Sequence, residues 1–161
     1  MSGKLDYSFL EIKEKIEAWC AYRDRCHSEV RKKLKDLGAD QEDTYALTAH
    51  LVENRFLDEQ RFADSYISGK HKIKKWGRNK IVQQLKAKQV HENCIKSALK
   101  TIDENLYLEN LKDLAERKWK EKSGTIFQKK QKVTRYLYQK GYEFDLINFI
   151  LEELSEEDAN R

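Results

Sequence analysis

The sequence lacks proline altogether and contains only 6 glycines and 3 cysteines in 161 residues. Because proline interrupts helices and glycine weakens them, this scarcity favours helices throughout. The cysteines, Cys20, Cys26 and Cys94, form no disulfide framework, and their odd number is typical of a reducing cytosol. Their spacing from one another and from the histidines matches no usual zinc pattern, so neither a metal nor another cofactor is expected.

No segment approaches the roughly 20 consecutive apolar residues that span a bilayer, and residues 1–9 lack the apolar core of a signal peptide. We therefore expect a cytoplasmic protein without membrane contact, and the polar surface favours a monomer. No glycine-rich phosphate loop, Ser-His-Asp set or two-metal acidic cluster is evident, so an enzyme is not expected. The net charge of +4 is mild, and any anionic partner has to be argued from local clustering of charge.

Apolar residues recur along the chain with a period of about 50 residues. Their 4, 5, 5, 4 spacing suits two short amphipathic helices joined by a tight turn. A weaker copy lies upstream and includes Val30, Leu34 and Ala39. The two strongest copies are 52 positions apart and comprise Ile81, Leu85, Val90, Ile95 and Leu99, then Val133, Leu137, Tyr142, Ile147 and Leu151.

This pattern predicts an all-α protein of three tandem three-helix repeats, about nine helices, in an elongated, curved array. Such an array presents a long surface rather than one catalytic cleft, which favours a binding protein. We assign the repeats to residues 1–57, 58–104 and 105–161, the third with an acidic C-terminal tail that is expected to fray from Glu152. The expected helices are 7–24, 28–37, 41–54, 59–73, 78–88, 92–103, 106–122, 126–140 and 144–154.

Residues with known preferences for helix ends mark several of these boundaries. Ser28 and Asp58 are expected to cap helix N-termini, because their side-chain oxygens can accept from free backbone N–H groups. Gly38 and Gly141 stand where a left-handed glycine would end a helix.

Two stretches of the chain carry positive charge without any acid. No acidic residue lies between Asp64 and Glu92, and another acid-free window runs from Ser123 to Tyr142. The windows occupy equivalent places in successive repeats, so stacked repeats would align them as one basic stripe suited to phosphate contacts. The candidate contact residues are Lys70, Lys72, Lys74, Lys75, Arg78, Lys80, Lys129, Lys130, Lys132 and Arg135.

A blander interpretation of the windows is a solvated face whose charges are balanced by acids on neighbouring helices. Trp76 lies within the first window and could stack on an unpaired base, or it could belong to the core. Nothing in the sequence indicates the reading of a base sequence, since no recognition-helix signature or zinc-finger spacing is present.

The run Phe56–Tyr66 resembles the aromatic-Leu-Asp-acid-x-Arg-Phe-Ala-x-x-Tyr signature of the RecX regulatory proteins. Downstream, Gly77–Lys88 is similar to their Gly-x-x-x-Ile-x-x-x-Leu-x-x-Lys-Gly segment, and Leu137–Tyr142 to their Leu-x-x-Arg-Gly-Phe motif. The likeness covers roughly residues 25–154. Gln89 replaces the usual turn glycine, so that helix end is expected to be capped differently, and Lys140 replaces a common arginine.

The resemblance implies three tandem three-helix repeats that bind the filament of the RecA recombinase and limit its activity. The activities concerned are ATP hydrolysis, DNA strand exchange and co-protease function, which belong to recombination, DNA repair and the SOS response. The basic stripe would then meet acidic RecA surface or the phosphates of single- or double-stranded DNA. Two other interpretations stay open: a DNA-binding protein that coats DNA without sequence specificity, and a helical-repeat scaffold for another protein.

Overall fold

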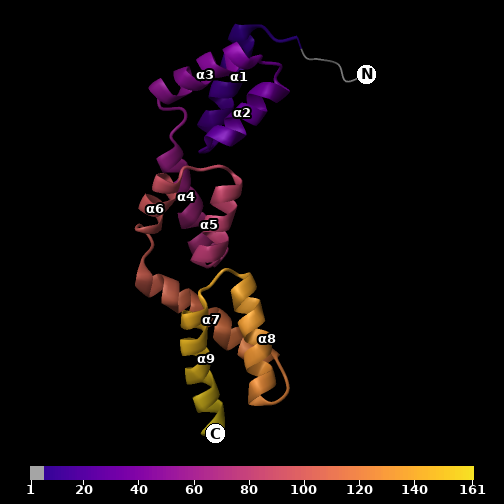
Figure 1. The fold of residues 1–161 in the computed structure, drawn as a ribbon, viewed down its shortest axis with the longest axis vertical. Helices are drawn as coiled ribbons and strands as arrows, with labels where there is room; N and C mark the ends of the chain where they lie inside the picture. The colour runs from indigo at the N-terminus through magenta and orange to yellow at the C-terminus, as the bar shows by residue number, and fades with distance from the viewer. Residues whose placement is uncertain (1–5) are drawn as a thin grey trace. The chain divides into compact units, whose positions relative to one another are not determined.

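A computed structural model describes residues 6–161, and over this range it contains nine α-helices and no strand (Figure 1). The prediction of an all-α protein is confirmed, and each helix overlaps an expected one. Their bounds are α1 Phe9–Tyr22, α2 His27–Asp36, α3 Gln41–Glu53, α4 Glu59–Lys72, α5 Arg78–Ala87, α6 Glu92–Leu99, α7 Glu104–Glu121, α8 Ile126–Gln139 and α9 Phe144–Ala159.

The described chain forms two compact units, and the division passes through α4 and α5. The N-terminal unit comprises the chain up to Tyr66 together with Leu85–Ala98. The C-terminal unit comprises Ile67–Gln84 and Leu99–Arg161.

The core of the N-terminal unit is made by the apolar faces of α1, α2 and α3. Ile16, Val30, Leu34 and Leu47 are each fully buried there. The i, i+4 spacing of Val30 and Leu34 places both side chains on one face of α2, which is why this short, highly charged helix buries a stripe.

The Phe56–Tyr66 motif is built into the N-terminal unit as a structural element. Leu57 and Phe62 are almost completely buried, and Asp58 accepts a hydrogen bond from the backbone N–H of Arg61, as a helix cap does. The guanidinium of Arg61 donates to Asp24 at 2.6 Å and also to the backbone carbonyl of Arg55. The motif therefore closes α4 onto the turn that follows α1.

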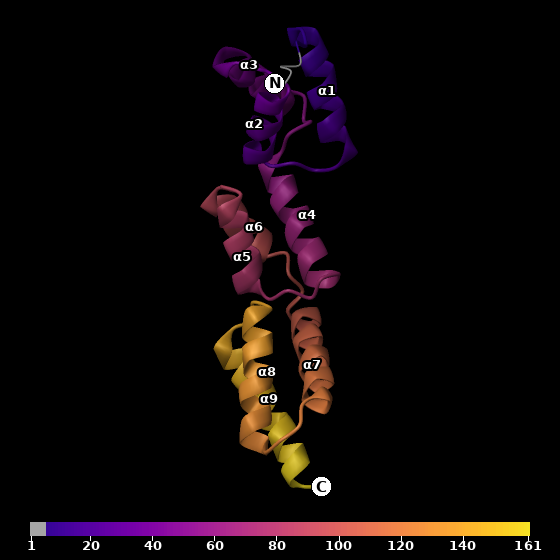
Figure 2. The ribbon, with the colours of Figure 1, turned by 90° about the vertical axis from the view of Figure 1, so that its right-hand side faces the viewer.

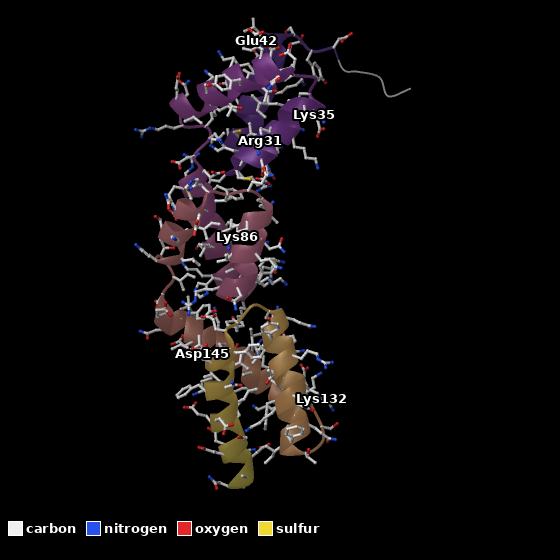
Figure 3. All side chains as sticks on the ribbon, viewed as in Figure 1. Arg31, Lys35, Glu42, Lys86, Lys132 and Asp145 are labelled. Carbon is white, nitrogen blue, oxygen red and sulfur yellow. The ribbon has the colours of Figure 1, made fainter. Side chains whose placement is uncertain are left out.

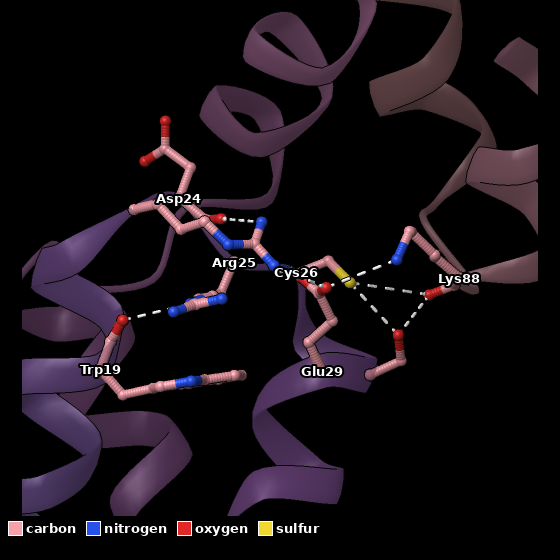
Figure 4. A network of polar contacts seen from close by, with 8 residues as sticks. Trp19, Asp24, Arg25, Cys26, Glu29 and Lys88 are labelled. Carbon is pink, nitrogen blue, oxygen red and sulfur yellow. Dashed lines mark hydrogen bonds and ion pairs between the residues drawn. The ribbon is translucent and has the colours of Figure 1, made fainter. Parts of the chain in front are cut away.

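The expectation that Ser28 caps a helix is wrong, because α2 begins at His27, one residue earlier. Ser28 instead donates to the carbonyl of Lys88 at 2.6 Å, and Glu29 accepts from the backbone N–H of Cys26 at 3.1 Å (Figure 4). The three cysteines are free thiols; Cys20 and Cys26 are buried and Cys94 is half-buried.

In the C-terminal unit, α7, α8 and α9 pack against one another (Figure 2). Their core includes Leu111, Val133, Leu137 and Ile147, all fully buried. The turn between α4 and α5 also belongs to this unit. There the N–H of Gly77 donates to the carbonyl of Lys140 at 2.8 Å, a backbone approach that leaves no room for a β-carbon at position 77.

The helix end at Gln89 does not have a different cap, contrary to expectation. Gln89 has φ 61°, so it takes the left-handed conformation that Gly38 and Gly141 take at the corresponding ends of α2 and α8. The next residue's N–H also bonds back in the same way, from Val90 to the carbonyl of Leu85 at 3.1 Å. The geometry of the turn is thus kept, and the left-handed strain falls on a residue with a side chain.

The acidic tail is helical rather than frayed. Helix α9 continues to Ala159, because Asp158 near its end accepts hydrogen bonds from Trp119 Nε1 at 2.8 Å and Lys129 Nζ at 3.1 Å. These bonds lower the pKa of the Asp158 carboxyl.

Candidate interaction surface

All ten predicted contact residues belong to the C-terminal unit, and the structure sorts them by what surrounds each charge. Four of them form ion pairs with acids of α7 or α9 or of the turns before these helices. The pairs are Lys75–Asp113 at 3.0 Å, Arg78–Glu143 at 2.8 Å, Lys129–Asp158 at 3.1 Å and Lys130–Glu152 at 2.6 Å. For these four residues the structure matches the interpretation of a face balanced by neighbouring acids.

Arg78 is the most firmly held of the four. Its guanidinium contacts Glu143 and, at 2.7 Å, Glu104, and it lies 4.0 Å from the centre of the Tyr107 ring. Burial opposes the charge of Arg78, but the hydrogen bonds and charges of the two carboxylates prevail and raise its pKa. The hydroxyl of Tyr107 also donates to Glu143, so Arg78 belongs to a structural network.

Trp76 lies half-buried between two lysines of the first window. Lys70 Nζ is 4.7 Å and Lys80 Nζ is 4.3 Å from its ring centre. The negative π-face of the indole attracts both ammonium groups.

A second ring with two lysines lies in the same unit. Lys118 Nζ is 4.4 Å and Lys140 Nζ is 6.0 Å from the centre of the Tyr136 ring. Burial lowers the pKa of Lys140, and the charges of Lys80, Lys118 and Lys74 lower it further. We call Lys70, Lys74, Lys80, Lys118 and Lys140, with the rings of Trp76 and Tyr136, the lysine cluster.

The lysine cluster concentrates like charges that repel one another. Lys80, Lys118 and Lys74 lie near enough to Lys140 to disfavour the protonated form of that residue. An anion placed among these ammonium groups would relieve the repulsion. The arrangement is therefore suited to phosphate or carboxylate groups of a partner.

Three cations of α8 line another surface of the C-terminal unit. Lys130, Lys132 and Arg135 border a groove of about 860 Å³, to which Lys122 also contributes (Figure 3 labels Lys132). Its other lining residues are Phe127, Gln128, Gln131, Thr134, Tyr138 and Phe144, and we call this surface the α8 groove. The two basic windows thus contribute to two surfaces, the lysine cluster and the α8 groove.

Among the predicted residues, Lys72, Lys74 and Arg135 are exposed and have no hydrogen bond or ion pair within residues 6–161. Lys132 is also exposed, and its Nζ donates to the carbonyl of Ser123 at 3.2 Å. These four residues, rather than the ion-paired ones, have charges most open to a partner.

Sequence reasoning missed Lys118 and Lys122, because both lie near acids of α7 and outside the acid-free windows. It also missed Phe127, whose side chain is 67% exposed. An available signal was the helical spacing, which places Phe127 roughly 100° around α8 from the buried face of Val133 and Leu137.

Within the described range, no group of three His, Cys, Asp or Glu side chains could hold a metal ion. None of the helices described there is long and apolar enough to cross a membrane.

These features define an all-α protein of consecutive three-helix domains with basic surfaces on its C-terminal unit. Two family models match the chain: the second three-helix domain of RecX over residues 58–99 and the third over residues 105–151. A Regulatory protein RecX of Vibrio campbellii is 30% identical over 151 residues, covering 94% of this chain and 96% of the relative. The chain belongs to the RecX family.

Other relatives are longer. A Regulatory protein RecX of Clostridium perfringens strain 13 is 31% identical over 134 residues, which are 81% of this chain and 62% of that protein. The chain thus spans about three fifths of the length of the clostridial relatives that it matches.

Solved structures support the fold. The crystal structure of RecX from Lactobacillus salivarius superposes with a TM-score of 0.82 at 23% identity, covering 91% of this chain and 96% of that one. A second crystal structure of regulatory protein RecX gives a TM-score of 0.78 at 23% identity, covering 89% of this chain and 74% of that one.

Proposed function

We propose that this protein is a non-enzymatic, cytoplasmic regulator that binds the RecA–DNA filament as a monomer and inhibits it. The inhibited activities are DNA-dependent ATP hydrolysis, strand exchange and co-protease function. Membership of the RecX family is the observation that carries the proposal, since its members that match this chain are named regulatory proteins.

The lysine cluster supports a filament as the partner. A filament on DNA offers phosphates and protein carboxylates close together, and both can lie among ammonium groups that repel one another when the protein is alone. Lys74, a member of the cluster, is exposed, and so is Lys72, two residues before it in the chain. We expect these residues to act mainly on the association rate and its salt dependence, as exposed interface charges do.

The predicted contacts consequently divide into two groups. Lys72, Lys74, Lys80, Lys132 and Arg135, with Lys70 beside Trp76, are proposed to meet the partner. Lys75, Arg78, Lys129 and Lys130 would have to exchange an internal ion pair for an external one, which reduces their net contribution to binding.

The test is a titration of the protein into preformed RecA–single-stranded DNA filaments while ATP hydrolysis is followed. Binding to the same DNA without RecA is measured in parallel. Inhibition well below the concentration that coats bare DNA is the expected result. Unchanged ATPase and strand exchange at equimolar protein would refute the proposal.

Charge reversal locates the surface. The double variant Lys74→Glu, Lys80→Glu should weaken inhibition about tenfold or more, because both residues contribute to the same positive region. The double variant Lys112→Glu, Lys120→Glu is the matched control, since both lysines are exposed on α7, neither is a member of the cluster, and the net charge changes equally. An equal loss in both proteins would indicate a general effect of net charge.

A second candidate function, coating of DNA, is favoured by the same lysine cluster. It predicts steeply salt-dependent affinity for DNA without RecA, with a slope near the number of phosphates neutralised. Inhibition that occurs only where bare DNA is saturated would support this candidate over the first.

A further inference from the structure

The α8 groove combines exposed aromatic rings with cations of one sign. Phe127 is 67% exposed, and Tyr138 and Phe144 are each 52% exposed. Exposed aromatic side chains that gather at one surface mark a site of interaction. Tyr138 and Phe144 stack with ring centres 4.5 Å apart and form one apolar plate. Every charged residue that lines the groove is basic.

The spacing along α8 gives the groove two apolar ends. Phe127, Gln131, Thr134 and Tyr138 follow one another at intervals of 4, 3 and 4 residues, so they form one stripe of the helix. At a rise of about 1.5 Å per residue, Phe127 and Tyr138 are roughly 16 Å apart along the axis. Between these ends the stripe is polar.

Arg135 provides the cation between the two ends. Lys130 already pairs with Glu152, and Lys132 donates to a backbone carbonyl. Arg135 is exposed, and no described residue accepts a hydrogen bond from it. A guanidinium with free donors is suited to a bidentate contact with a carboxylate.

These features fit a peptide better than a single nucleic-acid strand. Successive bases stack on closely spaced rings, whereas Gln131 and Thr134 separate the two apolar ends here. Two acids stand next to lining residues without lining the groove themselves: Glu152 pairs with Lys130. Asp145 follows Phe144 in the first turn of α9 (Figure 3 labels Asp145). A continuous ladder of phosphates would be repelled by these acids, while a peptide can place its carboxylates selectively.

We propose that the α8 groove binds an extended acidic segment of a partner protein. One apolar side chain of the segment packs on Phe127, a second packs on the Tyr138–Phe144 plate, and a carboxylate between them pairs with Arg135. A run of acidic residues repels itself and stays extended. Because alternate side chains of an extended chain share one face, two apolar residues six positions apart, about 20 Å at ~3.3 Å each, both face the groove and reach across the roughly 16 Å between its ends. The inference goes beyond the proposed function and does not depend on which protein supplies the segment.

The test is fluorescence anisotropy with a fluorescein-labelled peptide that contains Phe-Glu-Glu-Glu-Glu-Glu-Phe between Gly-Ser flanks, in which both Phe side chains share one face of the extended chain. One comparison peptide replaces each Glu by Gln, and another replaces each Phe by Ser. We expect saturable binding of the first peptide and affinity about tenfold lower for each of the others, since each removes one kind of contact. Equal binding of the glutamine peptide would overturn the proposal.

Variants of the protein place the binding site. Phe127→Ala and Arg135→Glu should each reduce affinity for the acidic peptide about tenfold. Phe149→Ala is the matched control, because Phe149 is 63% exposed in the same unit and does not line the groove. Equal effects of Phe127→Ala and Phe149→Ala, or the absence of saturable binding, would refute the assignment.

A labelled thymidine oligonucleotide is the remaining comparison. If it displaced the peptide and its own binding were lost in Phe127→Ala, the groove would be a nucleic-acid site and the proposal would be wrong. Because no recombinase is present in these assays, their failure leaves the filament-regulator proposal standing.

Discussion

The imidazole of His71 packs against the ring of Tyr107, with 5.7 Å between ring centres, yet neither of its nitrogens has a hydrogen-bond partner in the described chain. The side chain is 1% exposed. A buried polar group without a partner costs roughly 1–3 kcal/mol, so His71 is a destabilising residue inside the C-terminal unit.

This environment predicts a dependence of stability on pH. Burial lowers the pKa of His71 below 6.5, the charges of Lys72 and Arg78 lower it further, and Asp103 and Glu104 oppose the shift. Between the folded-state pKa and 6.5 the unfolded chain binds a proton that the folded chain does not, so stability falls as pH drops through this range. Urea titrations at a series of pH values between neutrality and pH 5 should show the decline.

His71→Leu should remove that decline and raise the free energy of unfolding at neutral pH by about 1 kcal/mol. Leucine has similar volume and no polar atom to satisfy, which is the reason for the gain. A variant that was less stable and kept the wild-type pH dependence would show that another group causes it.

Glu143 and Glu104 share Arg78 as a partner but differ in exposure, with side chains 26% and 67% exposed. Glu143→Gln should lower the free energy of unfolding by about 2 kcal/mol, because it leaves a half-buried guanidinium and the Tyr107 hydroxyl poorly satisfied. Glu104→Gln should change it by less than about 0.5 kcal/mol, since an exposed pair contributes little. Chemical denaturation of both variants measures the difference, and equal effects would contradict this account of the network.

Gln89→Gly should stabilise the N-terminal unit. A left-handed conformation costs a residue with a β-carbon roughly 1–2 kcal/mol, and glycine avoids that cost at some expense in unfolded-state entropy. The variant also loses the 2.7 Å hydrogen bond from Arg31 to Gln89, which is exposed and weak. A net gain of about 0.5 kcal/mol is expected in urea denaturation.

Gln89→Ala separates the two contributions. It keeps the strained conformation and loses the bond to Arg31, so it should be slightly less stable than the natural chain. If the alanine variant gained as much stability as the glycine variant, the strain at this turn would not be the cause.

The fold followed from the sequence because helix formation is governed by local patterns. The spacing of apolar residues such as Ile81 and Leu85 located the short helices, and the same residues are fully buried in the structure. The start of α2 was not predicted correctly. Ser28 has the chemistry of a cap, but its hydroxyl is used by the carbonyl of Lys88, a residue 60 positions away.

The surfaces were predicted in part, for a related reason. An acid-free window counts neighbours along the chain, whereas ion pairs form between neighbours in space. Lys75 lies 38 residues from Asp113, and Arg78 lies 65 residues from Glu143. Counting the cations of an acid-free window therefore overestimated how many of them have no ion-pair partner. Lys118 was missed for the opposite reason, since acids adjacent in sequence hid a cation that the fold brings to Lys140.

Lys140 allows binding and stability to be separated. It is half-buried, and burial together with Lys80, Lys118 and Lys74 disfavours its charged form. Lys140→Met keeps the length and apolar stem of the side chain and removes the charge, so it should leave the free energy of unfolding unchanged or raise it by up to about 1 kcal/mol.

Under the proposed function, the same substitution should weaken inhibition of the RecA ATPase, because the lysine cluster loses a charge that an anionic partner would meet. If the methionine variant were more stable and less inhibitory, the repulsion between Lys140 and its neighbouring lysines would be a cost in stability that serves the binding of an anionic partner. Lys140→Arg keeps the charge and is the control, with inhibition expected to stay within about twofold of the natural chain. A methionine variant that inhibits as well as the natural chain would assign Lys140 a structural role and move the contact surface toward Lys72 and Lys74.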